Sequence, residues 1–330
     1  MVDFSVAIRT YNKSEQIPPI LEALRSQVGT ESINWEIVIV DNNSSDDTAE
    51  LIRQYQATWD RAFPLRYFLE PKQGASIARK RAIQESQGEF IGFLDDDNLP
   101  TPDWVAEAYS FGKAHPEAAA FSGQIHGKFE VDPPPNFRQI ASYLAIIERG
   151  NKVFSYNTRK GRVLPPGAGL VICKQAWLDC VPDNLLLLGP VGKSLGLKGE
   201  DMESLAHVQN AGWEILYNPK LHIYHEVPAW RLERDYLLSL VRSIGLAQHH
   251  IRMTRAKAWQ KPFIFPVYFL NDLRKVVVFY FKKHKVIQTD VVAACEMERL
   301  TSGLVSPFYL WKNLPAYSSE PLPCAEPVKE

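Results

Sequence analysis

Several features that mark particular protein classes are missing from this chain of 330 residues. It has no stretch of about 18 uncharged apolar residues, so we predict no membrane-spanning helix. It has no internal repeat, and a strand pattern begins almost at the first residue, with no signal-peptide pattern before it. We therefore expect a cytoplasmic globular protein.

Cysteine and net charge are also scarce. The four cysteines, at positions 173, 180, 295 and 324, show no C-x-x-C pair and no Cys/His zinc spacing, so we expect them to pack as small apolar side chains in a reducing compartment. A formal net charge of −1 gives no electrostatic reason to expect a nucleic-acid partner. Positive charge is local instead, because residues 231–290 carry 12 Lys/Arg and 4 Asp/Glu.

The most informative stretch is an apolar run that ends in three consecutive carboxylates. Residues 90–94 read as a buried strand, and Asp95, Asp96 and Asp97 follow it directly. Like charges this close repel one another unless a cation or a donor-rich ligand lies between them. If the chain stayed extended, Asp95 and Asp97 would share one side, which suits Mg²⁺ or Mn²⁺ bound to substrate phosphates. The alternative is a solvated acidic turn that caps a helix.

Strand and helix patterns alternate through the first 115 residues. We predict strands at 3–9, 35–40, 65–69 and 90–94, and helices at 17–26, 48–56, 74–88 and 102–115. This alternation predicts an α/β fold, with a mostly parallel central sheet flanked by helices. A further strand is expected at 118–127.

Polar residues follow three of the predicted strands, and in parallel sheets such strand ends form the ligand-binding edge. After the first strand, Tyr11 offers a ring on which a base could stack, between Thr10 and Asn12. Asp41 can accept a hydrogen bond from a base, and Arg79 can meet phosphate or base oxygens. Each has an ordinary alternative: Tyr11 as a surface aromatic, Asp41 as a helix-loop cap, and Arg79 as part of a solvated basic face.

Four segments in this order resemble the motifs of the family 2 glycosyltransferases of GT-A fold: residues 5–12, 40–48, 74–79 and 94–100. The resemblance covers about residues 3–228. It implies an inverting transferase that uses a nucleotide-diphospho-sugar, with uridine as the expected base, and a divalent metal. One departure is Arg9, where the family usually has proline.

The resemblance also implies roles for particular residues. The implied uridine contacts are Thr10, Tyr11, Asn12 and Asp41; Arg79 resembles a base or phosphate contact, and Asp95 and Asp96 resemble ribose and phosphate contacts. Asp97 resembles the metal ligand of the DxD motif, and His225 matches a histidine near the metal, which would be Mn²⁺ or Mg²⁺. Residues 164–172 resemble the segment that lines the donor-sugar and acceptor cleft, where Gly167 and Gly169 would allow close backbone approach.

A carboxylate pair follows later in the chain. Glu200 and Asp201 begin a predicted helix, and acidic residues there are ordinary N-terminal caps. They also match the family's Glu-Asp motif. A hydroxyl nucleophile needs a carboxylate within hydrogen-bond reach, so we assign Asp201 as the general base and Glu200 as a second catalytic residue, with acceptor binding as the alternative role of Glu200.

The last third reads as mainly helical. Residues 262–283 are strongly apolar but contain charges, so we expect an interfacial helix whose basic residues lie near anionic headgroups, or else a helix packed on the core. This places peripheral contact with the inner membrane face in 231–290. The predicted organisation is a nucleotide-sugar-binding half (1–115), an acceptor-binding half (116–228), a helical extension (229–315) and a disordered tail (316–330).

The predicted function is sugar transfer from a nucleotide-diphospho-sugar to a hydroxyl of a glycan or lipid-linked acceptor, in polysaccharide or cell-envelope glycan synthesis. Two alternatives stay open. A nucleotidyltransferase would share the α/β pattern and the acids, but it normally has a glycine-rich loop after the first strand, and residues 10–13 contain no glycine. A nucleotide-sugar-binding protein without turnover would keep the binding site but would not catalyse transfer of the sugar. The sequence does not specify the sugar, the acceptor or the linkage.

Overall fold

A central sheet organises the computed structural model, which describes residues 1–157, 164–192 and 194–313. Its strands lie in the order β3-β2-β1-β4-β8-β6-β9-β5, with β7 paired to β9. The first four are parallel to one another: β1 (Phe4–Thr10), β2 (Trp35–Asp41), β3 (Leu65–Leu69) and β4 (Phe90–Asp95). Helices connect them in chain order: α1 (Ile17–Arg25), α2 (Thr48–Ala57) and α3 (Ala75–Glu85).

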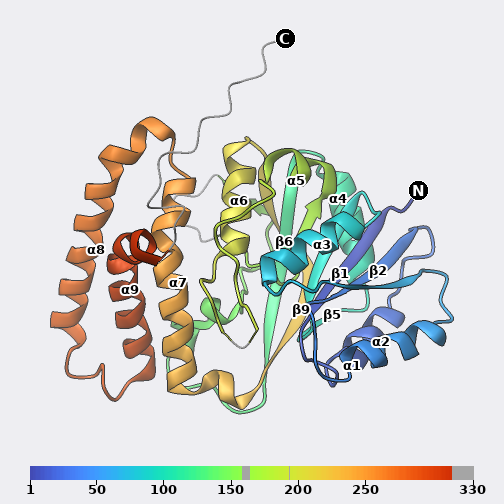
Figure 1. Ribbon diagram of the computed structural model, residues 1–330, viewed down its shortest axis with the longest axis horizontal. Coiled ribbons are helices and arrows are strands. Elements are labelled where there is room, and N and C mark those ends of the chain that lie inside the picture. Colours follow the sequence, from blue (N-terminus) through green and yellow to red (C-terminus); the bar gives the residue numbers. More distant parts are fainter. Residues whose placement is uncertain (158–163, 193, 314–330) are drawn as a thin grey trace, which may run out of the picture.

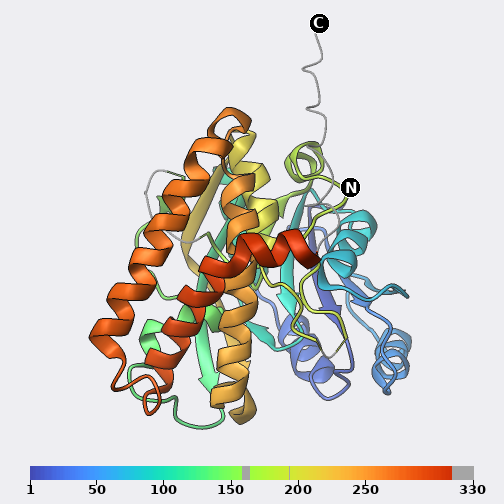
Figure 2. The ribbon, with the colours of Figure 1, turned by 60° about the vertical axis from the view of Figure 1, so that its left-hand side comes forward.

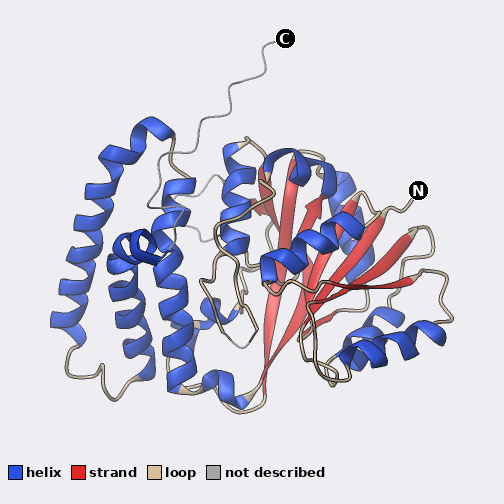
Figure 3. Cartoon of the chain, in the orientation of Figure 1, coloured by secondary structure: helices blue, strands red, loops and turns tan. Residues whose placement is uncertain are grey.

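The second half of the sheet mixes strand directions. β8 (Val171–Cys173) pairs antiparallel with both β4 and β6 (Ala118–Phe129), whereas β6 and β9 (Glu214–Val227) are parallel. β5 (Asn98–Pro100) and β7 (Phe154–Ser155) are antiparallel to β9. The predicted α/β class with helices on the central sheet is confirmed (Figure 3), and parallel pairing predominates in its N-terminal half.

Both faces of the sheet are covered, which explains why the strands read as continuous apolar runs. Alternate residues of β1 point to opposite faces: Phe4, Val6 and Ile8 join the core that contains α1, α2 and α4 (Trp104–Ala114). Ala7 joins the core on the other face, with α3, α5 (Lys174–Cys180) and α6 (Glu200–Asn210). Most of the predicted site residues lie at or just after the ends of strands, or at the start of α6.

Three long helices form the predicted extension: α7 (Arg234–Thr254), α8 (Lys261–Lys283) and α9 (Val291–Asn313). Short 3₁₀ turns accompany them: η1 (Phe137–Gln139), η2 (Ala141–Leu144), η3 (Ala229–Leu232) and η4 (Ala258–Gln260). A third apolar cluster joins α7 and α9 to η1 and η2. Figure 1 shows α8 on the outside, far from the sheet, and Figure 2 shows α9 crossing α7.

α8 is only partly packed, since Asp272 is its one buried residue. Within the described ranges, no helix has the length and apolar character needed to span a membrane. The predicted disordered tail, 316–330, lies outside those ranges. The predicted boundary at residue 115, between a nucleotide-sugar-binding half and an acceptor-binding half, stays a prediction.

Candidate active site

The acidic run after β4 bends instead of staying extended. The strand ends at Asp95, and Asp96 and Asp97 form the turn into β5, so simple alternation does not describe their directions. The Asn98 side chain closes this turn: its Nδ2 donates to Asp97 Oδ1 at 2.9 Å, and its Oδ1 accepts from the Asp95 amide at 3.1 Å. Asn98 also lies opposite His225 in the β5–β9 ladder, which brings that histidine to the acids.

Asp95 and Asp96 differ in their cationic partners. Arg9, the residue that departs from the family pattern, donates from Nε to Asp95 Oδ1 at 2.8 Å. Burial alone would raise the pKa of Asp95, but the charge and hydrogen bond of Arg9, together with the charge of Arg79, outweigh it, and the pKa is lowered. Asp96 has no such ion pair among the described residues. Its burial, together with the charge of Asp97, raises the pKa of Asp96 to about 7.

Asp97 lies in a compact cluster with His225 and Arg231. Arg231 Nη1 donates to Asp97 Oδ2 at 2.7 Å and lies 3.0 Å from His225 Nε2, while His225 Nε2 is 3.3 Å from the same Asp97 oxygen. Although burial opposes the shift, His225 and Arg231 hold the pKa of Asp97 well below its ordinary value. His225 Nδ1 is buried without a hydrogen-bond partner among the described residues.

This cluster fits a divalent cation, with the protein supplying part of the coordination. Adjacent ligands of an octahedral Mg²⁺ or Mn²⁺ lie about 3 Å apart, given bonds of about 2.1 Å, which matches the Asp97–His225 separation of 3.3 Å. Within the described ranges, no group of three or more His, Cys, Asp or Glu could hold a metal. The remaining ligands would therefore have to be substrate oxygens or water, and the Arg231 guanidinium lies where the ion would bind.

Asp201 lies at the start of α6 on a platform built by three elements. Its Oδ2 accepts from the Gly167 amide at 2.8 Å, its Oδ1 forms an ion pair with Arg79 Nη1, and Arg79 in turn lies over the Phe93 ring, 4.7 Å from the centroid. A Cβ on residue 167 would collide with the side-chain ends of both Arg79 and Asp201, so a larger residue there would displace this pair. Burial raises the pKa of Asp201, and the Arg79 charge only partly offsets this effect.

Glu200 links the two groups of acids. Its Oε1 is 3.6 Å from Arg9 Nη1, and its Oε2 accepts from the Gly199 amide at 3.1 Å. Arg9 therefore connects Asp95 to Glu200. Lys198 lies on the same wall, and burial lowers its pKa although Glu200 opposes that shift.

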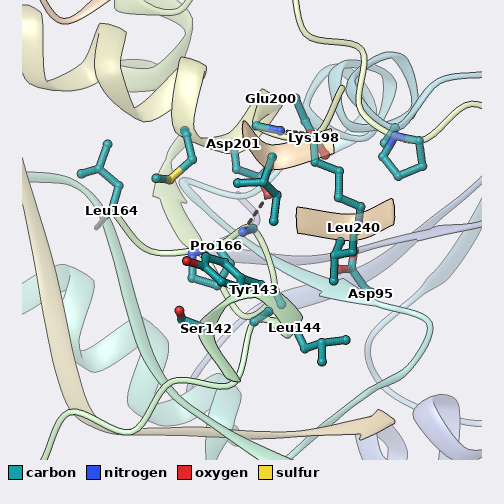
Figure 4. Close-up of a pocket in the computed structure, with 18 of the residues that line it drawn as sticks. Asp95, Ser142, Tyr143, Leu144, Leu164, Pro166, Lys198, Glu200, Asp201 and Leu240 are labelled. Carbon is teal, nitrogen blue, oxygen red and sulfur yellow. Dashed lines mark hydrogen bonds between the residues drawn. The ribbon is translucent and has the colours of Figure 1, made fainter. Parts of the chain in front are cut away.

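A cavity of about 930 Å³ joins these residues. Figure 4 shows Asp95, Lys198, Glu200 and Asp201 around it, facing Tyr143, Leu144 and Leu240. Eight predicted site residues line it: Thr10, Tyr11, Asp95, Asp96, Asp97, Glu200, Asp201 and His225.

Three predicted residues do not line this cavity. Asn12 Oδ1 accepts from the Ser45 amide at 2.7 Å, and so ties the first loop to the second. Asp41 is fully buried and accepts from the Ser44 amide and the Tyr67 hydroxyl at 2.8 and 3.0 Å, which matches the loop-cap alternative. Arg79 lies behind Asp201.

The sequence predicts one cation of the site, Arg79, and misses three others. In the sequence, Arg9 stands out only as a departure from the family pattern, and no motif marks Lys198 or Arg231. The only hint in the sequence that these residues belong to the site is their position: Lys198 precedes the Glu-Asp pair, and Arg231 follows His225 by six residues. The basic residues that α7, α8 and α9 add to the cavity were not predicted either.

Comparisons with known proteins agree with this geometry. The family model of glycosyl transferase family 2 matches residues 5–182. Glycosyltransferase AglE of Haloferax volcanii is 36% identical over 107 residues, which are 32% of this chain and 34% of that protein. The GalNAc(5)-diNAcBac-PP-undecaprenol beta-1,3-glucosyltransferase of Campylobacter jejuni is 32% identical over 100 residues, 30% of each chain. The matched part thus spans about a third of each of these relatives.

The fold also matches solved structures. The mannosyltransferase PcManGT of Pyrobaculum calidifontis, solved with GDP-Man and Mn²⁺, superposes with a TM-score of 0.56 at 17% identity. The superposition covers 96% of this chain and 77% of that one. At this identity the match shows a shared fold, and it includes the region of the three C-terminal helices.

Proposed function

Because this chain belongs to glycosyl transferase family 2, we propose that it is an inverting, metal-dependent transferase. It moves a sugar from a nucleotide-diphospho-sugar, with uridine as the expected base, to a hydroxyl of a glycan or lipid-linked acceptor in cell-envelope or polysaccharide synthesis. One observation carries the proposal. A single cavity is lined both by the acids after β4 and by Glu200 and Asp201, so a donor phosphate site and a base face the same space.

The donor lies at the ends of the parallel strands in this proposal. The residues proposed to bind or support it are Thr10, Tyr11, Asn12, Asp41, Arg79, Asp95 and Asp96. Three of them lie behind the cavity wall, where Asn12 and Asp41 hold the loops and Arg79 holds Asp201, so they support the donor site indirectly. Asp97 and His225 would hold Mn²⁺ or Mg²⁺, which when bound offsets the charge that grows on the departing nucleoside diphosphate.

Asp201 acts as the general base in this proposal. Its carboxylate is fixed by the Gly167 amide and by Arg79, yet an ionised carboxylate keeps further lone pairs for an acceptor hydroxyl. The raised pKa makes it a stronger base than a solvated aspartate. It accepts the hydroxyl proton while the oxygen attacks the anomeric carbon from the face opposite the leaving group, and Glu200 orients the acceptor.

The extension suggests where the reaction takes place. Phe263 and Phe281 on α8 are 71% and 72% exposed, and basic residues surround them, so we propose peripheral contact with the inner face of an anionic membrane through 231–290. The Campylobacter relative, whose printed name includes an undecaprenol diphosphate, supports a lipid-linked acceptor for this chain as well.

A donor screen tests the proposal. We expect one UDP- or GDP-sugar to raise the melting temperature only when Mn²⁺ is present, and to be turned over to a nucleoside diphosphate without pyrophosphate. Asp201→Asn should lower turnover about 10²- to 10⁴-fold with little change in donor affinity. The exposed Asp60→Asn serves as a matched control.

Each other outcome identifies an alternative. Release of pyrophosphate would indicate a nucleotidyltransferase. Donor binding without any turnover, even hydrolysis, would indicate a binding protein. Full activity in Asp201→Asn would show that another group is the base.

A further inference from the structure

The cavity continues beyond the proposed donor and base residues, between α7, α8 and α9. Its lining there contains one stripe of α7, in which residues three or four positions apart share a face: Leu240, Ile244, Gln248, Ile251, Arg252 and Arg255. Lys275 of α8 and Arg299 of α9 complete this part. We call it the acceptor arm.

The acceptor arm is apolar toward the site and cationic at its far end. Leu240 and Ile244 lie with Tyr143 and Leu144 near the catalytic residues. Three cations, Arg252, Arg255 and Lys275, lie at the far end, where Asp272 joins Arg252 to Lys275, whereas Arg299 lies beside Gly245 and near Tyr143.

These cations exceed the carboxylates beside them. Asp272 pairs with Arg252 Nη2 through Oδ1 at 3.1 Å and lies 3.9 Å from Lys275 Nζ, and Glu296 pairs with Arg299 at 3.1 Å. Neither acid lines the cavity, and no described carboxylate pairs with Arg255. At the far end, one acid, Asp272, against three cations, Arg252, Arg255 and Lys275, leaves a positive excess, so an anionic group is favoured there.

α8 connects this anion site to the outside of the protein. Lys275 lines the cavity, whereas Phe263, Val267, Leu270 and Phe281 are at least 63% exposed and recur at helical spacing along another side of the helix. The single acid of α8, Asp272, is buried. A molecule that places its anionic group in the arm would therefore meet an apolar, acid-free surface next to it.

We propose that the acceptor arm binds the phosphate or diphosphate of an amphiphilic acceptor, with the sugar toward Asp201 and the apolar chain toward α8. This inference rests on the proposed transferase function and names its acceptor class as a lipid-linked, phosphate-bearing sugar. A neutral glycan would leave Arg255 without a charged partner and the positive excess of the arm unbalanced, and a soluble anionic glycan would leave the exposed α8 surface unexplained.

Farnesyl diphosphate is a suitable probe, and its binding to the full chain can be measured by titration calorimetry. UDP and Mn²⁺ are present at saturating concentrations, so that the proposed donor site is already filled. We expect binding to wild type, and at least tenfold weaker binding in Arg255→Gln/Lys275→Gln. Arg242→Gln, on an exposed part of α7 outside the cavity, should match wild type. Retained UDP binding in each variant shows that it is folded.

Two further ligands separate the contributions of charge and chain. Farnesol and inorganic pyrophosphate should each bind at least tenfold more weakly than farnesyl diphosphate. The proposal is overturned if UDP displaces farnesyl diphosphate, if the double variant binds like wild type, or if pyrophosphate alone binds as tightly, which would indicate a soluble anionic acceptor. If the wild-type protein does not bind UDP, the donor proposal is contradicted instead. Binding of farnesyl diphosphate to the acceptor arm can then still be measured without UDP.

Discussion

Replacing Arg231 with methionine should increase the affinity of the free protein for Mn²⁺. Arg231 Nη1 is within 3.0 Å of both Asp97 Oδ2 and His225 Nε2, the two atoms that fit a metal. An ion about 2.1 Å from each of them would either overlap this nitrogen or lie next to its positive charge, so the guanidinium opposes cation binding until it moves. Without a nucleotide present, the displaced guanidinium has no diphosphate to replace Asp97 as its partner.

The size of the effect follows from the contacts that must break. A hydrogen bond to a charged group contributes about 1.5–3 kcal/mol. Since about 1.4 kcal/mol corresponds to a tenfold change in affinity, removing the competing Arg231–Asp97 bond should tighten Mn²⁺ binding by about 10- to 150-fold. Methionine keeps much of the apolar stem and adds no charge, while Arg231→Lys should stay close to wild type because it keeps the charge.

The measurement is a titration of free Mn²⁺ by electron paramagnetic resonance, without nucleotide, on wild type and both variants. Arg242→Met, which changes an exposed arginine far from the acids, controls for the loss of one positive charge. Equal or weaker Mn²⁺ binding by Arg231→Met, in a protein that melts normally, would show that Arg231 does not compete with the metal.

Two other predictions follow from the same structure. Because burial raises the pKa of Asp201 and the base must be ionised, kcat/KM for transfer should fall on acidification at a higher pH than for a solvated aspartate; a pH profile that stays flat down to about pH 4 would contradict this. Phe263→Asp/Phe281→Asp should reduce cosedimentation with phosphatidylglycerol vesicles several-fold, and salt should weaken wild-type binding; Leu178→Asp, on exposed α5, is the control, and unchanged sedimentation would rule out α8 as the contact.

The N-terminal half of the fold could be predicted well from the sequence. Three of the four predicted strands there, β1, β2 and β4, are buried almost throughout, and helix α1 has one apolar face, so apolar runs and periodicity locate them. The predicted strand at 35–40 and the helix at 17–26 match β2 and α1 to within a residue. The C-terminal half of the sheet is harder, because β5, β7 and β8 are only two or three residues long and depend on the pairing partner rather than on local pattern.

The site could be predicted only where its residues follow strand ends. Asp95 to Asp97 and Asp201 stand out as acids at element boundaries. The pairings of Arg79 with Asp201 and of Arg231 with Asp97 join residues more than 100 positions apart, and no local signal announces such contacts. The turn at Asp96 and Asp97 also depends on a remote strand, because β5 pairs with β9.

The charges of the described site suggest why donor and metal should bind together. Around the proposed donor end, five carboxylates (Asp95, Asp96, Asp97, Glu200 and Asp201) lie with four cations (Arg9, Arg79, Lys198 and Arg231). This near balance offers little net attraction to a divalent cation alone or to a diphosphate alone. A cation that displaces Arg231 frees a positive guanidinium, and a diphosphate that arrives with the cation gives that guanidinium a new partner. UDP should therefore strengthen Mn²⁺ binding in wild type more than in Arg231→Met, because in the variant no side-chain charge has to be re-paired.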